Sequence, residues 1–207
     1  MRKHVCCCGK FLCDDIFAGA VICYAFDYEV EGDDIYPRGD FMTKNITHEQ
    51  LEIRELTIDD LAAVFHLGEL LFTSEFSSSM YRTWDEYEIT TLFNSDNELC
   101  LVAELDGEIV GFALGTTVEK QNSAWKYGYL VWIGVRPGLQ KCGAGRKLFN
   151  ELKKRMVDQG VRMIVIDTDA DNEAGINFFK KQGFDNIQQH VYMTLNLSRT
   201  RQKRKSD

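Results

Sequence analysis

The fold of this chain is decided at residues 130–148, which read LVWIGVRPGLQKCGAGRKL. An apolar run that favours a β-strand stops at a Pro-Gly pair, and a short loop with two close glycines follows. Leu148, Phe149, Leu152 and Met156 then recur at the spacing of one helical face. The order of strand, glycine loop and helix predicts a site where unpaired backbone N–H groups face an anion.

The two glycines, Gly143 and Gly145, let a phosphate group approach the main chain closely because they lack side chains. Single residues exclude two nucleotide-binding loops. A P-loop requires lysine after its second glycine, at the position that Ala144 occupies. A dinucleotide-binding loop requires a third glycine, where Leu148 stands. The loop therefore predicts another phosphate-bearing ligand.

Two motifs together resemble the GNAT superfamily of N-acetyltransferases. The acetyl-CoA loop of that family follows a strand ending in Val-x-Pro, here residues 135–137. The loop reads Gln-x-x-Gly-x-Gly, here residues 140–145. A later helix of the family carries Asn, then Phe-Tyr, then Gly-Phe, which Asn172, residues 178–179 and residues 183–184 match except that Phe replaces Tyr.

The resemblance covers residues 51–197 and implies an α/β (α+β) fold with a mixed, mostly antiparallel sheet flanked by helices. In that fold a bulge splays the strand before the glycine loop from the following strand. The implied activity is transfer of an acetyl group from acetyl-CoA, the cosubstrate, directly to a primary amine. The alternative is a GNAT-fold sensor or interaction protein that binds acyl-CoA with little catalysis.

Hydrophobic patterning gives the same order of elements without the resemblance. A Thr57–Asp60 pair predicts a helix start, and Asp106-Gly107 predicts a hairpin turn. The expected strands lie at 51–56, 100–105, 109–118, 127–135, 163–167 and 191–197, and the expected helices at 61–72, 84–93, 143–158 and 173–181.

The resemblance also assigns ligand contacts. Main-chain groups of Ile133, Gly134 and Val135 are expected to pair with the pantetheine arm, and the Ile133 N–H to stabilise the thioester oxygen. Asn172 is expected to contact the same arm while capping its helix, and Phe179 to stack on it. The pyrophosphate is expected to lie along the loop residues Gln140, Lys141, Cys142, Gly143, Ala144, Gly145 and Arg146.

Proton transfer is less clearly encoded. Family members often protonate the departing thiolate with a tyrosine, but Phe179 holds that position. Tyr192, Tyr127 and Tyr129 are the candidate substitutes, and the thiolate can also leave unaided. The strand at 127–135 carries no carboxylate, so Glu119 is the candidate general base, with an ordered water chain as the alternative.

Length, net charge and cysteine content indicate the organisation of the rest of the chain. A chain of 207 residues supports one sizeable core at 51–197, and its net charge of −8 argues against a general nucleic-acid binder. An extension at 1–50 holds five of the seven cysteines. Cys8 and Cys13 form a C-x4-C element that zinc could use, and free thiols are the alternative. Residues 198–207 form a basic tail expected to be disordered.

The expected location is cytoplasmic. No apolar run reaches membrane-spanning length, and Asp14 and Asp15 interrupt the one candidate signal segment. The expected partner is a small-molecule or peptide amine, and the resemblance is compatible with a homodimer.

Overall fold

The computed structural model describes residues 50–72, 84–119, 125–139, 142–189, 191 and 193. Within them, one five-stranded sheet has the order β1-β2-β3-β4-β5, antiparallel except for the parallel pair β4–β5. The strands are β1 (Glu52–Glu55), β2 (Cys100–Leu105), β3 (Glu108–Glu119), β4 (Lys126–Val135) and β5 (Met163–Val165). The helices are α1 (Leu61–Leu71), α2 (Glu86–Ser95), α3 (Ala144–Asp158) and α4 (Glu173–Gln182), with short 3-10 turns η3 (Ile58–Asp60) and η4 (Asn97–Leu99).

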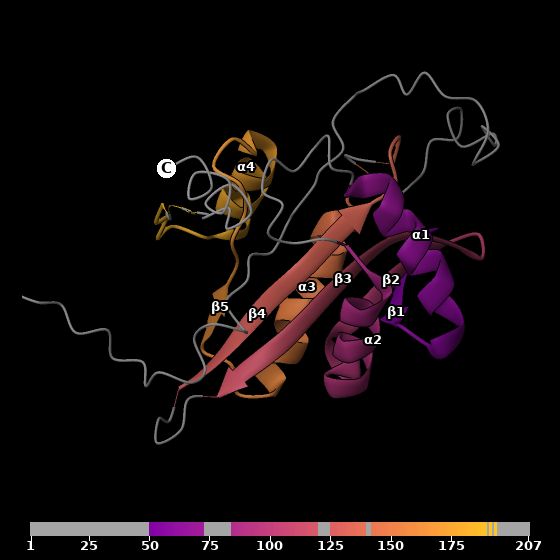
Figure 1. Cartoon of the computed structure of the whole chain (residues 1–207), viewed down its shortest axis with the longest axis horizontal. Helices are drawn as coiled ribbons and strands as arrows, with labels where there is room; N and C mark the ends of the chain where they lie inside the picture. The colour runs from indigo at the N-terminus through magenta and orange to yellow at the C-terminus, as the bar shows by residue number, and fades with distance from the viewer. Residues whose placement is uncertain are drawn as a thin grey trace, which may run out of the picture.

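The sheet separates two hydrophobic layers. One layer joins α1 and α2 to the face that carries Phe112 and Trp132. The other joins α3 to the opposite face, which carries Ala113 and Ile133. Figure 1 shows α1 and α2 on one side of the sheet and α3 on the other. Alternation of adjacent β4 residues between the layers is what a strand buried on both faces requires.

The predicted α/β sheet and the order of its described elements are confirmed. Asp106 and Gly107 both have positive φ, 53° and 82°, as the predicted Asp-Gly hairpin turn demands. The Thr57–Asp60 pair also forms, because Asp60 accepts hydrogen bonds from the Thr57 N–H and hydroxyl. β5 is two residues shorter than predicted. The strand expected at 191–197, the extension before residue 50 and the basic tail lie outside the described residues, apart from Val191 and Met193, which belong to no strand.

An ion-pair network ties β1 to the start of α1. Arg54 on β1 donates to both carboxylate oxygens of Asp60 over 2.6 and 2.9 Å, and its Nε donates to Glu104 of β2 over 2.8 Å. Asp60 is buried, so its charge depends on these partners. The Arg54 hydrogen bonds hold the pKa of Asp60 well below the usual aspartate range.

We expect Asp60→Asn to destabilise the fold by about 1–3 kcal/mol near neutral pH, because one charged partner of the network is lost. The folded pKa of Asp60 lies below its unfolded pKa, so its contribution exists above about pH 4 and fades as the pH falls below that value. Urea unfolding at about pH 7 and about pH 3 measures this difference. A gap between wild type and variant that stays constant with pH would contradict the assignment.

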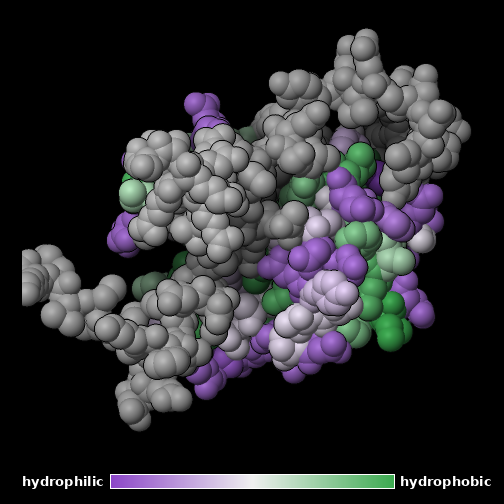
Figure 2. All heavy atoms as spheres, in the orientation of Figure 1, coloured by the Kyte–Doolittle hydropathy of each residue, from purple (hydrophilic) through white to green (hydrophobic). Residues whose placement is uncertain are grey.

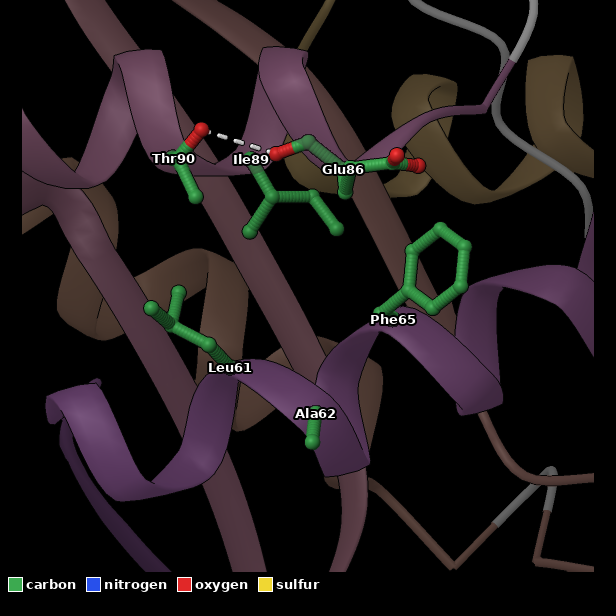
Figure 3. A pocket seen from close by; sticks show the side chains of 6 residues that line it. All are labelled: Leu61, Ala62, Phe65, Glu86, Ile89 and Thr90. Carbon is green, nitrogen blue, oxygen red and sulfur yellow. Dashed lines mark hydrogen bonds between the residues drawn. The ribbon is translucent and has the colours of Figure 1, made fainter.

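A shallow groove lies between the N-terminal halves of α1 and α2. Figure 2 shows hydrophobic and hydrophilic residues side by side over this face. In Figure 3, Phe65 rises from α1 and Ile89 descends from α2 into the groove. Its volume is about 180 Å³, and its lining consists of Leu61, Ala62, Phe65, Glu86, Ile89 and Thr90.

Candidate functional site

β4 and β5 form a fork. They pair only from Tyr127–Met163 to Tyr129–Val165, and β4 then continues to Val135 without pairing to β5. Val131 is the extra residue of a bulge, since Gly115 pairs with Leu130 while Leu114 pairs with Trp132. A bulge bends its strand and increases the local twist, which turns β4 away from β5. Figure 1 shows the two strands diverging, as the predicted splay requires.

The main-chain direction along β4 tells which groups face the fork. The Arg136 N–H donates to the Val110 carbonyl of β3 over 2.8 Å. Because successive residues of a strand direct their main-chain groups to opposite sides, Ile133 and Val135 direct theirs away from β3, toward the fork. Gly134 directs its groups to β3, so its main chain does not face the fork as those of Ile133 and Val135 do.

Gly134 contributes space to the site instead of hydrogen bonds to a ligand. A Cβ atom built on this residue would lie 2.5 Å from Leu71 Cδ1 and 3.4 Å from Phe112 Cζ. The end of α1 therefore packs directly on β4 between the two residues that face the fork. This contact holds the fork edge of β4 in place from the side of the sheet that α1 and α2 cover.

The chain turns sharply between β4 and α3. Gly138 has a φ of 84° in the turn after Pro137, and Gly143 has a φ of 93° immediately before α3. The Lys147 N–H donates the first helical hydrogen bond of α3, to the Gly143 carbonyl over 2.9 Å. The N–H groups of Ala144, Gly145 and Arg146 precede that first helical bond, so the helix provides no carbonyl for them. These amides and the helix dipole favour an anion at this point.

Two of the remaining loop residues, Cys142 and Arg146, lie within the described part of the chain. Cys142 is half-buried, and its thiol donates to the Leu139 carbonyl over 2.8 Å, which closes the loop just before Gly143. Arg146 is exposed at the first turn of α3, where its cation is available to an anion. Gln140 and Lys141 lie outside the described residues.

Asn172 and Phe179 order the start and the interior of α4. Asn172 accepts from the Gly175 N–H over 3.0 Å and donates to the Thr168 hydroxyl over 2.8 Å, which confirms the predicted helix cap. The Phe179 ring is 2% exposed and packs against Phe149 and Phe184, with ring centroids 6.0 and 5.3 Å apart. The ring at the family's tyrosine position thus lies inside an aromatic cluster rather than on an open surface.

Glu119 lies far from the fork edge. Its side chain is 73% exposed and pairs with Lys126 over 3.3 Å, at the start of β4. On β3, Glu119 lies six residues from Ala113, which is the partner of Ile133, and six residues span about 20 Å along a strand. A general base must come within hydrogen-bonding reach of its proton or act through one water. The position therefore does not suit Glu119 for the predicted role at Ile133.

Tyr129 is the described tyrosine that lies at the fork itself. It is 3% exposed, and its hydroxyl donates to Asp167 Oδ1 over 3.2 Å. Tyr127 stacks on Trp125 two residues earlier, at the paired end of β4. Tyr192 lies outside the described residues. Asp167 was missed in the sequence, because the pattern placed it inside a longer β5.

The buried Cys100 is no candidate nucleophile, because a thiol attacks as the thiolate. Burial raises the pKa of the Cys100 thiol to about 12, and the nearby Asp96 charge adds to that shift. Within the described ranges, no three His, Cys, Asp or Glu side chains gather as a metal site would require, and no helix is both long and apolar enough to cross a bilayer. Cys8 and Cys13 lie outside those ranges, so nothing described supports the predicted zinc.

Comparison with known proteins agrees with this geometry. Residues 62–184 match the acetyltransferase (GNAT) family. An acetyltransferase of Pectobacterium atrosepticum is 30% identical over 139 residues, which cover 66% of this chain and 89% of that protein. The chain therefore belongs to the GNAT acetyltransferase family.

Two solved structures share the fold. An aminoglycoside acetyltransferase from an uncultured soil metagenomic sample, in complex with trehalose, has a TM-score of 0.58 at 22% identity, covering 72% of this chain and 99% of its own. The NatC complex bound to Gag peptide and CoA has a TM-score of 0.58 at 17% identity, covering 67% of this chain and 87% of the matched chain. At these identities the likeness concerns the fold alone.

Proposed function

We propose that this protein is an N-acetyltransferase that moves the acetyl group of acetyl-CoA directly to a primary amine. The observation that carries the proposal is the fork edge at Ile133 and Val135, followed directly by the glycine-bounded start of α3. Family membership supports the acetyl transfer, and a fold neighbour that binds CoA supports the donor.

Two main-chain surfaces bind different parts of acetyl-CoA, the acetyl donor. Ile133 and Val135 pair with the pantetheine arm as an added strand would pair with a sheet edge. The N-terminal amides of α3 hold the pyrophosphate, and Arg146 adds a cation. Gln140 and Lys141 belong to the same loop by sequence, so we assign them to the pyrophosphate as well.

The reaction needs an unprotonated amine. Its nitrogen forms a bond to the thioester carbonyl carbon, the carbon–sulfur bond breaks, and the electron pair leaves on sulfur. The Ile133 N–H stabilises the charge that develops on the carbonyl oxygen, and losing one such donor commonly costs about 10²–10³ in rate. The amine proton passes to water, since Glu119 is remote, and the thiolate takes up a proton from solvent.

A second function is favoured by one observation. Phe179 cannot donate a proton, and its ring is buried among other phenylalanines. A protein that binds acetyl-CoA as a sensor, with little catalysis, would tolerate this substitution. Binding and turnover must therefore be measured separately.

The test combines CoA release with product analysis. The full-length protein is mixed with acetyl-CoA and, in turn, a polyamine, an aminoglycoside, a lysine peptide and a peptide with a free N-terminus. We expect thiol release above the rate of hydrolysis with at least one class, and an acetylated amine by mass spectrometry. CoA binding without any acetylated amine would favour the sensor, and absence of CoA binding would contradict both functions.

A further inference from the structure

A side-chain hydrogen bond joins Tyr129 to Asp167 at the vertex of the fork. Tyr129 and Val165 form the last register pair of β4 and β5. Asp167 lies two residues beyond Val165, on the stretch of chain that leaves β5. The 3.2 Å bond from the Tyr129 hydroxyl to Asp167 Oδ1 therefore comes where backbone pairing has stopped.

This bond joins β4 to the chain after β5 without using the main-chain groups of either segment. Paired strands lie about 4.8 Å apart, and their N–H and C=O groups are consumed by each other. The Tyr129–Asp167 bond joins the chain after β5 to β4 through side chains instead of main-chain pairing, so the main-chain groups that Ile133 and Val135 direct toward the fork keep their access to a ligand.

Packing fixes the ring that makes this bond. Tyr129 is buried in the same apolar layer as Val131 and Trp132, and Val165 packs against that layer. Val131 is the bulge residue, so the ring lies within two residues of the point where β4 bends. A buried ring next to a bulge has little freedom to move, and its hydroxyl therefore presents one geometry to Asp167.

We propose that Tyr129 and Asp167 are positioning residues that set the width of the fork for the pantetheine arm of acetyl-CoA. The proposal rests on the function given above. It departs from the expectation that Tyr129 protonates the departing thiolate, since the hydroxyl proton is directed at Asp167. It requires only a hydrogen-bond acceptor at position 167, and not a negative charge.

The test compares four variants of the full-length protein by calorimetric titration with CoA. Tyr129→Phe and Asp167→Ala remove one partner each, and we expect either to weaken CoA binding by about three- to tenfold, the worth of one hydrogen bond. Asp167→Asn keeps an acceptor oxygen and should stay close to wild type. Tyr127→Phe makes the same change two residues earlier, before the vertex, and should also stay close to wild type.

Two further measurements separate positioning from other roles. The double variant Tyr129→Phe with Asp167→Ala should lose less affinity than the sum of the two single losses, because both single variants remove the Tyr129–Asp167 bond, and strictly additive losses would overturn the proposal. The KM for acetyl-CoA should rise with the dissociation constant of CoA, while the KM for the amine stays constant. An Asp167→Asn variant that raises only the amine KM would instead make Asp167 an amine-binding charge, and would overturn the proposal.

Failure of this inference can be told from failure of the proposed function. If the wild type binds CoA and Tyr129→Phe binds it as Tyr127→Phe does, the positioning role is wrong and the acetyltransferase proposal stands. If the wild type does not bind CoA, the proposed function fails. Amide hydrogen exchange of residues 130–135 in the free protein then decides, because loss of the bond must change their protection and unchanged protection overturns the inference.

Discussion

Gly143→Ala is expected to weaken CoA binding by about tenfold or more while leaving the protein folded. Gly143 precedes α3 with a φ of 93°, in the left-handed region that a side chain disfavours by about 1–2 kcal/mol. The loop can relieve that strain only by rotating the peptide groups that lead into the first turn. Those groups include the amides that we assign to the pyrophosphate, so the ligand loses its hydrogen-bond geometry.

Gly160→Ala is the matched control for this variant. Gly160 has a φ of 83° and follows the opposite end of the same helix, with no atom within 4 Å of its Cβ position. Both variants should lose a similar amount of stability, but CoA affinity measured by calorimetric titration should fall only for Gly143→Ala. Equal affinity in the two variants would show that the start of α3 does not hold the ligand.

Gly68→Ala is expected to destabilise the fold by about 3 kcal/mol, although alanine is the better helix former. A Cβ on Gly68 would lie 2.0–2.4 Å from three atoms of the Trp84 indole. The indole cannot move away easily, since its Nε1 donates to the Phe65 carbonyl over 2.8 Å. Its ring also packs against Phe112 and Trp132, at centroid distances of 5.2 and 5.1 Å.

The same substitution should change sign when the indole is absent. In a Trp84→Leu background the atoms that crowd Gly68 are removed, and Gly68→Ala should then stabilise the helix by about 0.5–1 kcal/mol. Urea unfolding of the four proteins in this cycle gives the comparison. A Gly68→Ala variant that is equally destabilised in both backgrounds would contradict the contact between α1 and Trp84.

Local signals in the sequence were sufficient for the elements and for the loop. The Asp106-Gly107 turn, the Thr57–Asp60 start and the Asn172 cap each depend on residues close together in the chain. The strand and helix around the glycine loop are encoded by their own hydrophobic periods. Only the resemblance to a family predicts the fork, because the point where two strands stop pairing is not encoded within either strand alone.

Relations between distant segments could not be predicted in the same way. Alternation along β4 removes Gly134 from the fork edge, but it becomes visible only once the β3 register is known. The distance of Glu119 from Ile133 likewise depends on that register. The pattern predicts Asp167 inside β5, and the Tyr129 hydroxyl that donates to it lies 38 residues earlier in the chain. Gly68 lies against Trp84 across a connecting segment whose sequence has no hydrophobic pattern that would predict the contact.

The central claim is that the fork and the start of α3 together form a site for acetyl-CoA, and thermal unfolding with ligands tests it most directly. At about 100 times its dissociation constant, a ligand of the folded state adds about 2.7 kcal/mol, which raises the Tm of a chain of this size by about 5–10 °C. We predict such a shift with acetyl-CoA and with CoA, and none with ATP or NAD. Equal shifts with ATP, or no shift with CoA, would contradict the claim.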